Sequence, residues 1–442
     1  MSEGQVVAVD IKTARLNPQE YQQNFSEMHP PLSDAAALVE ADRCYFCYDA
    51  PCTEACPTGI DVAGFISMIK SGNNAGAARL ILQENIIGGS CARVCPTETL
   101  CEQACVRNEQ DHRPVSIGLL QRHAVDAAMT VGQQFFSRAP DTGKRVAIVG
   151  AGPAGLSCAH GLACQGHQVS IFEAREKSGG LNEYGLAAYK MLDNFAHREI
   201  EYITAIGGID TRYGQRLGED FDTSSLLQEF DAVFLGMGLG GVNRLNLDNE
   251  DADGVMNAVD YISQIRQVGQ LSELAVGRQV VVIGGGMTAI DIATQVKMLG
   301  ADEVTLVYRR GPDAMAASEE EREFTQIKGV KILYNAKPVN IVTVDGQVRE
   351  VEFERKGETF TLAADMLFKA IGQSFSAKID SALELEKGRI RVDAQRKTSV
   401  AGVWAGGDCV YDGEDLTVAA AQDGKLAARS INEYLLKSTK GE

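Results

Sequence analysis

The sequence predicts an α/β protein in which a helical, cysteine-rich N-terminal domain precedes two Rossmann-like dinucleotide-binding domains. Eight of its 11 cysteines lie between Cys44 and Cys105, which marks the N-terminal domain. Two glycine-rich turns, beginning at Gly150 and Gly284, each follow an apolar strand and open a helix. A strand, a glycine-rich turn and a helix in this order are typical of the βαβ unit that binds dinucleotides.

Length and charge limit the classes of function. The 442 residues suggest about three domains at roughly 150 residues each. The net charge of −18 disfavours nonspecific binding to nucleic acid or to an anionic membrane. No apolar run approaches the roughly 18 residues of a membrane span, and Met1–Asp10 shows no secretory signal. We therefore expect a cytoplasmic protein.

The first domain is expected to cover residues 1–140. Apolar residues recur at helical spacing through Val62–Leu82 and through Ile117–Met129, which indicates helices in both stretches. Ser137–Lys144 is polar and contains proline and glycine, as linkers do. This linker separates the cysteine-rich domain from the first dinucleotide-binding domain.

The clustered cysteines fall into two sets. These are Cys44-x2-Cys47-x4-Cys52-x3-Cys56-Pro57 and Cys91-x3-Cys95-Pro96-x5-Cys101-x3-Cys105. Because a reducing cytoplasm disfavours structural disulfides, such a group of thiols indicates metal or cluster ligands. Close cysteine pairs and a Cys-Pro step are typical of a domain with two 4Fe–4S clusters. The alternative is a structural zinc site or a set of inert buried thiols, although no histidine pairs with a cysteine at a zinc-finger spacing.

The first glycine-rich turn lies in a complete βαβ unit. Arg145–Val149 is the strand expected before the turn, and Gln168–Phe172 is the strand expected after its helix. Gly150 permits the tight turn, Gly152 lets the backbone approach a pyrophosphate, and Gly155 allows the helix to pack closely on the strand. The free N–H groups at the start of the helix then face the pyrophosphate.

Further residues fit the same nucleotide site. Glu173 ends the second strand, where a carboxylate accepts hydrogen bonds from ribose hydroxyl groups. Gly179–Leu181 fits a loop that passes close to the nucleotide. Near the C-terminus, the short strand Gly402–Asp408 ends in Gly-Gly-Asp and a helix is expected from about Thr417 to Tyr434. The start of this helix is suited to the edge of a flavin, and Asp408 to a ribityl hydroxyl group.

The second glycine-rich turn repeats the arrangement. The strand Arg278–Ile283 leads into Gly284–Ala289 (GGGMTA), in which alanine replaces the third glycine, and the next strand is Val304–Tyr308. That strand ends in Arg309 and Arg310, and arginines at this place can pair with the 2′-phosphate of NADP. The alternative is that both arginines are solvated or contact the pyrophosphate.

The combination of two dinucleotide folds and a two-cluster domain resembles the family of the glutamate synthase small subunit and the N-terminal half of dihydropyrimidine dehydrogenase. Within this family the chain is most similar to the bacterial NAD-dependent dihydropyrimidine dehydrogenase subunits. The segments that carry the resemblance are 43–52 (RCYFCYDAPC), 56–58 (CPT), 91–97 (CARVCPT) and 117–121 (IGLLQ). The likeness covers essentially the whole chain.

The resemblance implies a discontinuous FAD-binding domain, residues 144–276 and 380–442, around an NAD(P)H-binding domain of residues 277–379. It implies one cluster on Cys44, Cys47, Cys52 and Cys105, and a second on Cys56, Cys95, Cys101 and Gln121. Spacing alone would make Cys91 the eighth ligand instead of Gln121. The implied FAD residues are Gly150, Gly152, Ala154, Gly155, Glu173, Gly180, Leu181, Lys190, Gly407, Asp408, Leu416, Thr417 and Val418. The implied nicotinamide-nucleotide residues are Gly285, Gly286, Met287, Thr288, Arg309, Arg310, Ala370 and Gly372.

The chain departs from the family pattern at three places. Met287 stands where the family often has Asn or Asp, which removes a polar contact. Ala187-Ala188 stands where Ile-Pro often precedes the residue that matches Lys190. Ala316 stands where the NADPH-using relative has a further arginine, so we expect NADH as the donor and keep NADPH as the alternative.

The family's activity implies an electron relay with no catalytic residue for pyrimidine chemistry in this chain. NADH reduces FAD, and single electrons pass through the clusters to an FMN-containing partner subunit, which interconverts uracil or thymine and the 5,6-dihydropyrimidines. The chain has no room for the barrel domain that carries FMN in the full-length relative, so we expect a hetero-oligomer, in the form of a heterotetramer. Alternatives are a glutamate synthase small subunit, a stand-alone NAD(P)H:acceptor (ferredoxin) oxidoreductase, and a non-enzymatic scaffold with degenerate cofactor sites.

Overall fold

The computed structural model describes residues 10–438, which form two compact units. The first unit contains residues 10–28, 184–189 and 242–373, and the second contains residues 29–183, 190–241 and 374–438. The chain passes between the units through α10 (Leu181–Tyr184), η2 (Ala188–Lys190), β5 (Gly241–Val242) and β14 (Gln373–Ser374). Residues 1–9, most of the segment in which no secretory signal is expected, lie outside the described residues.

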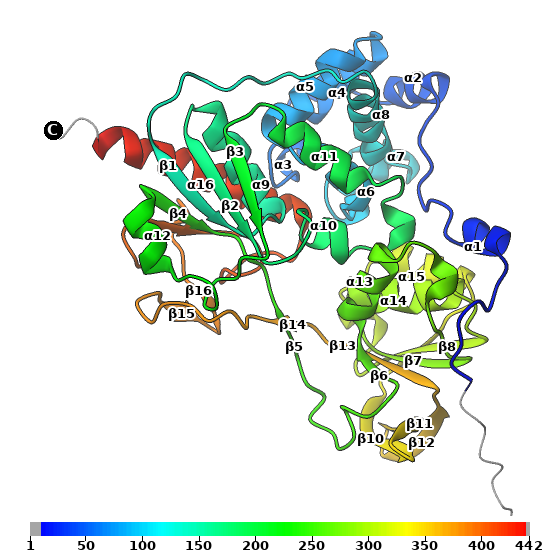
Figure 1. Cartoon of the computed structure of the whole chain (residues 1–442). Coiled ribbons are helices and arrows are strands. Elements are labelled where there is room, and N and C mark those ends of the chain that lie inside the picture. The colour runs from blue at the N-terminus through cyan, green and yellow to red at the C-terminus, as the bar shows by residue number, and fades with distance from the viewer. Residues whose placement is uncertain (1–9, 439–442) are drawn as a thin grey trace, which may run out of the picture. The chain divides into compact units, whose positions relative to one another are not determined.

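The second unit contains a five-stranded parallel sheet in the order β17-β4-β1-β2-β3 (Figure 1). Its strands are β1 (Arg145–Val149), β2 (Gln168–Glu173), β3 (Ile209–Tyr213), β4 (Ala232–Leu235) and β17 (Val403–Ala405). The C-terminal strand β17 pairs with β4, which confirms that this dinucleotide-binding domain is discontinuous. The other elements are α9 (Pro153–Cys164), α11 (Phe195–Thr204), α12 (Thr223–Glu229), β15 (Leu385–Glu386), β16 (Arg389–Ile390) and α16 (Thr417–Ser438).

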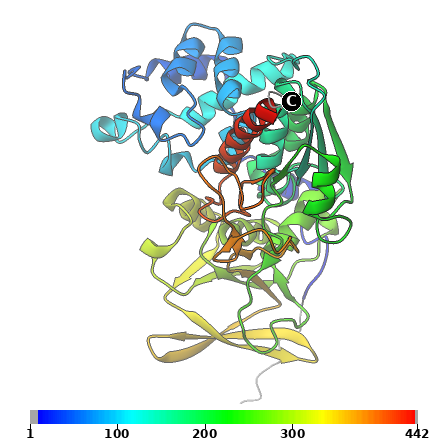
Figure 2. The same ribbon diagram turned by 90° about the vertical axis from the view of Figure 1, so that its left-hand side faces the viewer.

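The core of this sheet explains where its cofactor turn lies. Val146 and Ile148 of β1 pack in one cluster with Leu156 of α9 and with Ala427 and Ile431 of α16. Helices α9 and α16 therefore lie against each other on the sheet, as Figure 2 shows for the red helix α16. The strand β1 and the helix α9 meet at the glycine-rich turn.

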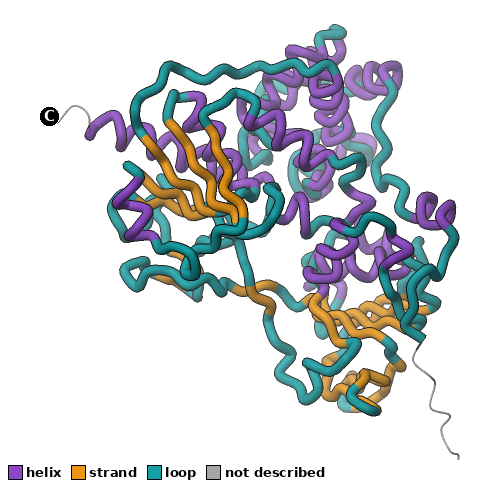
Figure 3. The backbone as a smooth tube through the Cα atoms, viewed as in Figure 1, coloured by secondary structure: helices purple, strands orange, loops and turns teal. Residues whose placement is uncertain are grey.

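The N-terminal part of the second unit is helical, and Figure 3 shows it as helices and loops. Its elements are α2 (Asp34–Asp42), α3 (Pro51–Glu54), α4 (Val62–Lys70), α5 (Asn74–Glu84), α6 (Gly88–Val94), η1 (Thr97–Thr99), α7 (Arg107–Asp111) and α8 (Ile117–Thr130). The predicted helix 117–129 is confirmed as α8. The stretch 62–82 is two helices, because Gly72 adopts a positive φ of 76° and the Asn73 side chain caps α5.

The first unit contains a second parallel sheet in the order β6-β13-β7-β8-β9. Its strands are β6 (Val255–Asn257), β7 (Gln279–Gly284), β8 (Glu303–Tyr308), β9 (Lys331–Tyr334) and β13 (Met366–Ala370). An antiparallel three-stranded sheet follows β9, with β10 (Lys337–Val344), β11 (Gln347–Arg355) and β12 (Glu358–Ala363). The helical elements are α1 (Pro18–Asn24), α13 (Ala258–Gln267), η3 (Leu271–Glu273), α14 (Met287–Met298), η4 (Pro312–Ala314) and α15 (Glu319–Ile327).

The compact units divide the chain differently from the three predicted domains. Residues 10–28 pack with the first unit, where Lys12 exchanges backbone hydrogen bonds with Val276 and the Asn24 amide donates to the carbonyl of Met298. The segment 242–276 also belongs to the first unit, because β6 pairs with β13. The helical domain and the discontinuous sheet together form the second unit.

A search of residues 10–438 finds no helix with the length and apolar character that crossing a membrane would require.

Candidate cofactor sites

The first glycine-rich turn has the shape that an incoming nucleotide phosphate requires. Gly150 adopts a positive φ of 97°, and a Cβ on Gly155 would lie 1.9 Å from the carbonyl oxygen of Gly150. Helix α9 begins after Gly152, and no side chain caps its start. A Cβ on Gly152 would come no closer than 3.8 Å to any atom, so the backbone there is open. The free N–H groups of this helix start are suited to a pyrophosphate.

Segments far apart in the sequence converge on this turn. A Cβ on Gly180 would lie 2.8 Å from the Cα of Gly152, so the loop after β2 touches the turn. The Thr417 hydroxyl donates to the side-chain oxygen of Asn182 (3.0 Å), which brings the start of α16 to the same loop. Gly407 approaches α9, because a Cβ there would lie 3.2 Å from the Cβ of Ala154.

Two acidic residues occupy the predicted positions. Glu173 is buried and accepts hydrogen bonds from the backbone N–H groups of Ala151 and Arg175, both at 2.8 Å. These bonds occupy part of the acceptor capacity of the carboxylate and leave lone pairs for ribose hydroxyl groups. Asp408 lies three residues beyond β17, and burial raises its pKa to about 6. A hydroxyl group of a ligand would supply the hydrogen bond that favours its ionised form.

The remaining predicted FAD residues lie in η2, at the start of α10 and around the start of α16. Lys190 is buried at the end of η2, and Leu181, at the start of α10, is 38% exposed. Leu416 and Val418 flank Thr417 at the start of α16, and the Val418 side chain belongs to the buried core. The structure thus places Val418 where only its backbone is available to a ligand.

The second glycine-rich turn leads into α14 in the same way. A Cβ on Gly285 would lie 2.3 Å from the ring of Tyr308, and one on Gly284 would lie 2.3 Å from the carbonyl oxygen of Ala370. Gly286 precedes α14, has no side-chain cap and has no atom within 4 Å of a built Cβ. Open backbone at a helix start again fits a phosphate group.

The other predicted nicotinamide residues surround this turn. Met287 and Thr288 form the first turn of α14. Arg309 and Arg310 follow β8 and are exposed, and the Arg310 guanidinium lies 5.4 Å from the ring centre of Tyr308. Gly372 has a positive φ of 95° and lies two residues beyond the end of β13.

The cysteines of the first predicted group surround one cavity. Cys44, Cys47, Cys52 and Cys105 all line it. In residues 10–438, no three His, Cys, Asp or Glu side chains converge closely enough to hold a single metal ion. The four thiols instead face a shared space, which is the arrangement that a multi-atom cluster needs.

Burial favours the neutral form of these thiols until a positively charged group binds to them. Burial raises the pKa of Cys52 to about 11, and the neighbouring thiols of Cys44 and Cys105 add to the shift. Burial likewise raises the pKa of Cys44, against a lowering by the N–H of Phe46. Thiolates are the ligand form, so their formation here is coupled to the binding of positive charge.

The second predicted group begins at Cys56, two residues after the end of α3. The pKa of Cys95 is raised well above its usual value, first by a hydrogen bond with Cys91, then by burial and by the thiols of Cys101 and Cys56. Burial also raises the pKa of Cys101. Cys56, Cys95 and Cys101 are therefore near neighbours.

Of the two candidates for the eighth ligand, Cys91 contacts Cys95 directly, and Gln121 lies on α8, which packs against α6. Cys91 is buried and accepts a hydrogen bond from the side-chain amide of Asn85 (3.2 Å). Gln121 is buried on α8 and donates from Nε2 to the carbonyl oxygen of Gly88 (2.7 Å). The bond to Gly88 fixes the amide plane of Gln121 and leaves its oxygen as the atom available to a metal.

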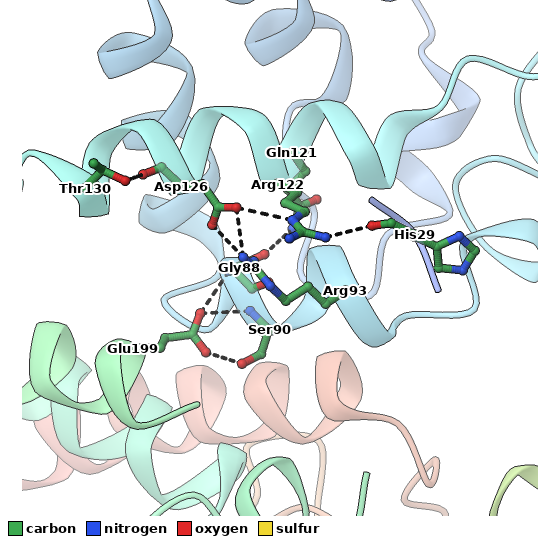
Figure 4. A network of polar contacts seen from close by, with 10 residues as sticks. His29, Gly88, Ser90, Arg93, Gln121, Arg122, Asp126, Thr130 and Glu199 are labelled. Atoms are coloured by element: carbon green, nitrogen blue, oxygen red, sulfur yellow. Dashed lines mark hydrogen bonds and ion pairs between the residues drawn. The ribbon is translucent and has the colours of Figure 1, made fainter. Parts of the chain in front are cut away.

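A network of charged residues that sequence reasoning missed holds α6, the helix between Gly88 and Cys95 (Figure 4). The Glu199 carboxylate, on α11, accepts from the N–H groups of Gly89 and Ser90 (2.9 Å each) and from the Ser90 hydroxyl. Burial raises the pKa of Glu199 to about 7. No local pattern marks this residue, because its partners lie more than 100 positions away.

Arg93 extends the network from α6 to α8. Its guanidinium donates to both oxygens of Asp126, at 2.7 and 2.8 Å, and to the carbonyl oxygen of Gly89. It also lies 3.5 Å from the ring centre of Phe195.

Arg107 is a second residue that the sequence analysis did not single out. It lines the cavity of the first cysteine group, lies 4.2 Å from the ring centre of Tyr45 and forms an ion pair with Asp111 (2.9 Å). Its place two residues after Cys105 was the available signal.

Models of known families match both the dinucleotide-binding part and the cysteine-rich part of the chain. Residues 144–424 match the model of the pyridine nucleotide-disulphide oxidoreductases. Residues 21–133 match the model described as dihydropyrimidine dehydrogenase domain II, 4Fe–4S cluster. FAD, NAD(P)H and 4Fe–4S clusters are therefore the cofactors of this type of chain, as predicted.

Individual relatives agree as well. The NAD-dependent dihydropyrimidine dehydrogenase subunit PreT of Escherichia coli is 36% identical over 94% of this chain and 98% of its own length. The glutamate synthase [NADPH] small chain of Escherichia coli is 33% identical over 93% and 94%. Thioredoxin reductase from T. acidophilum, at 21% identity, has the same fold over 66% of this chain and 98% of its own, with a TM-score of 0.54.

The matched family covers residues 144–424, and the full-length relatives confirm the resemblance that the cysteine and glycine motifs predicted. The chain belongs to the pyridine nucleotide-disulphide oxidoreductase family, in the group that includes the PreT subunits and the glutamate synthase small chains.

Proposed function

We propose that this chain is the electron-input subunit of an NAD-dependent dihydropyrimidine dehydrogenase. It takes reducing equivalents from NADH and passes single electrons to an FMN-containing partner subunit that interconverts uracil or thymine and their 5,6-dihydro forms. The observation that supports the relay most is that the second cysteine group and the FAD turn belong to one compact unit, joined by direct contacts between α16 and the cysteine-bearing segments.

The proposed FAD site lies at the carboxyl ends of the strands in the sheet β17-β4-β1-β2-β3. The open helix start after Gly152 binds the pyrophosphate, Glu173 accepts from the ribose, and Asp408 accepts from the ribityl chain. Lys190 is buried, and its ammonium group would stabilise negative charge on the reduced flavin ring. When bound there, FAD would supply a hydride acceptor for NADH and a donor of single electrons.

The proposed NADH site is the corresponding edge of the second sheet. The N–H groups after Gly286 bind the pyrophosphate, and Tyr308 forms one wall of the turn. Arg309 and Arg310 are exposed, and their guanidinium groups contact the pyrophosphate or a ribose of NADH. Ala316 carries no charge for a 2′-phosphate, which supports NADH over NADPH.

The proposed ligands of two 4Fe–4S clusters are the two cysteine groups. Cys44, Cys47, Cys52 and Cys105 hold the first cluster, and Cys56, Cys95 and Cys101 hold the second with Gln121 as fourth ligand. Because the potential of a cluster depends on ligand identity, an amide oxygen in place of a thiolate makes the second cluster less negative in charge.

The partner defines the substrate. The PreT relatives are named as subunits, which supports a hetero-oligomer, and we propose a cytoplasmic heterotetramer. The test is to purify the chain anaerobically with the protein that co-purifies with it, and to follow uracil with NADH as donor. Uracil should decrease only when both chains are present, and the partner should contain FMN.

A glutamate synthase small chain is the second candidate, because such a chain is 33% identical. The same purification separates the two. A very large amidotransferase as partner, with glutamate formed and uracil unchanged, would favour this second candidate.

A further inference from the structure

The ammonium group of Lys425 ties helix α16 to the segment that carries Cys56. Its Nζ donates to the carbonyl oxygen of Thr58 (2.8 Å), to the carbonyl oxygen of Glu84 (2.9 Å) and to the Glu84 carboxylate (2.9 Å). An ammonium has three N–H groups, so all of them are used. The side chain is 15% exposed, which shields these bonds from water.

The two carbonyl partners lie at structurally sensitive points. Thr58 is buried, and its hydroxyl lies 3.3 Å from the sulfur of Cys56. Glu84 is the last residue of α5, so Lys425 places a positive charge at the negative end of that helix. The chain then runs through residues 85–87 into α6, which carries Cys91 and leads to Cys95.

The other end of Lys425 is fixed next to the proposed FAD turn. Its neighbour Gly424 allows α16 to touch α9, because a Cβ there would lie 2.1 Å from the carbonyl oxygen of Ala154. The Ser157 hydroxyl of α9 also donates to the carbonyl of Ala421, one turn earlier on α16 (2.7 Å). Lys425 is thus anchored on the helix pair that borders the turn.

We propose that Lys425 is a positioning residue for the electron step between the flavin and the second cysteine group, since it holds the Cys56 turn against the FAD-binding helices. This inference rests on the proposed function. Thr58 connects the Lys425 ammonium to the Cys56 sulfur, because its carbonyl accepts from Lys425 and its hydroxyl lies beside the sulfur. The positive charge of Lys425 also stabilises an electron added to the second cluster, because net charge and hydrogen bonding near a cluster set its potential.

The test uses the holoenzyme and three variants. Lys425→Met removes the charge and the donors, Lys425→Arg retains both, and Arg429→Met changes an exposed cation one turn further along α16 as the matched control. Stopped-flow absorbance after mixing with NADH measures flavin reduction and cluster reduction separately. Potentiometric titration followed by electron paramagnetic resonance measures the potential of the second cluster.

Lys425→Met should leave flavin reduction by NADH unchanged, slow cluster reduction about tenfold, which corresponds to about 1.4 kcal/mol in the barrier, and make the potential of the second cluster more negative. Lys425→Arg should restore most of the rate, and Arg429→Met should match the wild type. If Lys425→Met has lost iron, Lys425→Gln takes its place, and its potential should still be more negative.

Wild-type rate and potential in Lys425→Met or Lys425→Gln would overturn the inference and leave the relay intact. Failure of the clusters to reduce in the wild type would overturn the relay itself.

Discussion

The carboxylate of Glu199, on α11 of the FAD-binding fold, accepts a hydrogen bond from the hydroxyl of Ser90 on the helix that leads to Cys95. The same carboxylate accepts from the N–H of Ser90 (2.9 Å), at the start of that helix. The bond joins two parts of the chain that carry different cofactor motifs. Glu199 is therefore a buried carboxylic acid, and its burial makes the stability of the protein depend on pH.

Replacing Glu199 with Gln should stabilise the protein at pH 8 and have little effect at pH 5. Burial raises the pKa of Glu199 from 4.5 to about 7, against the lowering by Ser90 and Arg93. The folded state therefore binds more protons than the unfolded state between these values, and stability falls as the pH rises through that window. The full cost above pH 7 is about 3 kcal/mol.

The measurement is the midpoint of thermal unfolding at pH 5 and at pH 8. Glu201→Gln is the control, because Glu201 lies on the same helix and is exposed. An equal change for Glu199→Gln at both pH values would contradict the prediction.

Gly286→Ala should weaken NADH binding without unfolding the protein. The residue has φ −101°, which alanine adopts freely, and no atom lies within 4 Å of the added methyl group. The stability change should stay below about 1 kcal/mol, whereas the methyl group occupies the approach of the pyrophosphate. The dissociation constant for NADH should rise about tenfold or more. In contrast, Gly284→Ala should destabilise the fold, because its Cβ would meet the Ala370 carbonyl.

Gln121→Ala and Cys91→Ser should separate the two candidates for the eighth ligand. If Gln121 is the ligand, the Gln121→Ala variant should lose up to about half of the bound iron, or the electron paramagnetic resonance spectrum of one cluster should change. Cys91→Ser should keep the iron content and the spectrum, because the Cys91 sulfur already bonds to Asn85 and Cys95. The reverse result would assign Cys91. Iron analysis and electron paramagnetic resonance give the answer.

Ala316→Arg should improve the use of NADPH. Ala316 is exposed, and its N–H donates to the carbonyl oxygen of Gly285 (3.0 Å), so its side chain lies beside the second glycine-rich turn. A guanidinium there gains a charge-assisted bond to the 2′-phosphate, worth about 1.5 kcal/mol. The kcat/KM for NADPH should rise about tenfold while that for NADH changes little. Equal change with both donors would place the new arginine at the pyrophosphate.

The local parts of the fold followed from the sequence. The strand 145–149 and the turn at Gly150 were predicted at their observed positions, because a Rossmann unit concentrates its signal in about 30 consecutive residues. The stretch 62–82 was less clear, since apolar spacing continues across the break at Gly72 and Asn73. Periodicity reports the buried face of a segment and says little about where one helix ends.

Long-range contacts could not be predicted in this way. Lys425 and Thr58 are 367 positions apart, and Glu199 and Gly89 are 110 apart. In the sequence, Lys425 and Glu199 are ordinary charged residues of amphipathic helices. Only the fold shows which groups they bind. The packing of residues 10–28 within the first unit is similar, because Tyr21 and Phe25 enter a core cluster whose other members lie far along the chain.

The central claim is that one chain carries electrons from NADH through FAD to its own iron–sulfur clusters. The most direct test is an anaerobic titration of the purified holoprotein with NADH, followed by visible absorbance and electron paramagnetic resonance. The account predicts that flavin and cluster absorbance both decrease and that a reduced-cluster signal appears as NADH is added. Flavin that is fully reduced by excess NADH beside clusters that stay oxidised would contradict it.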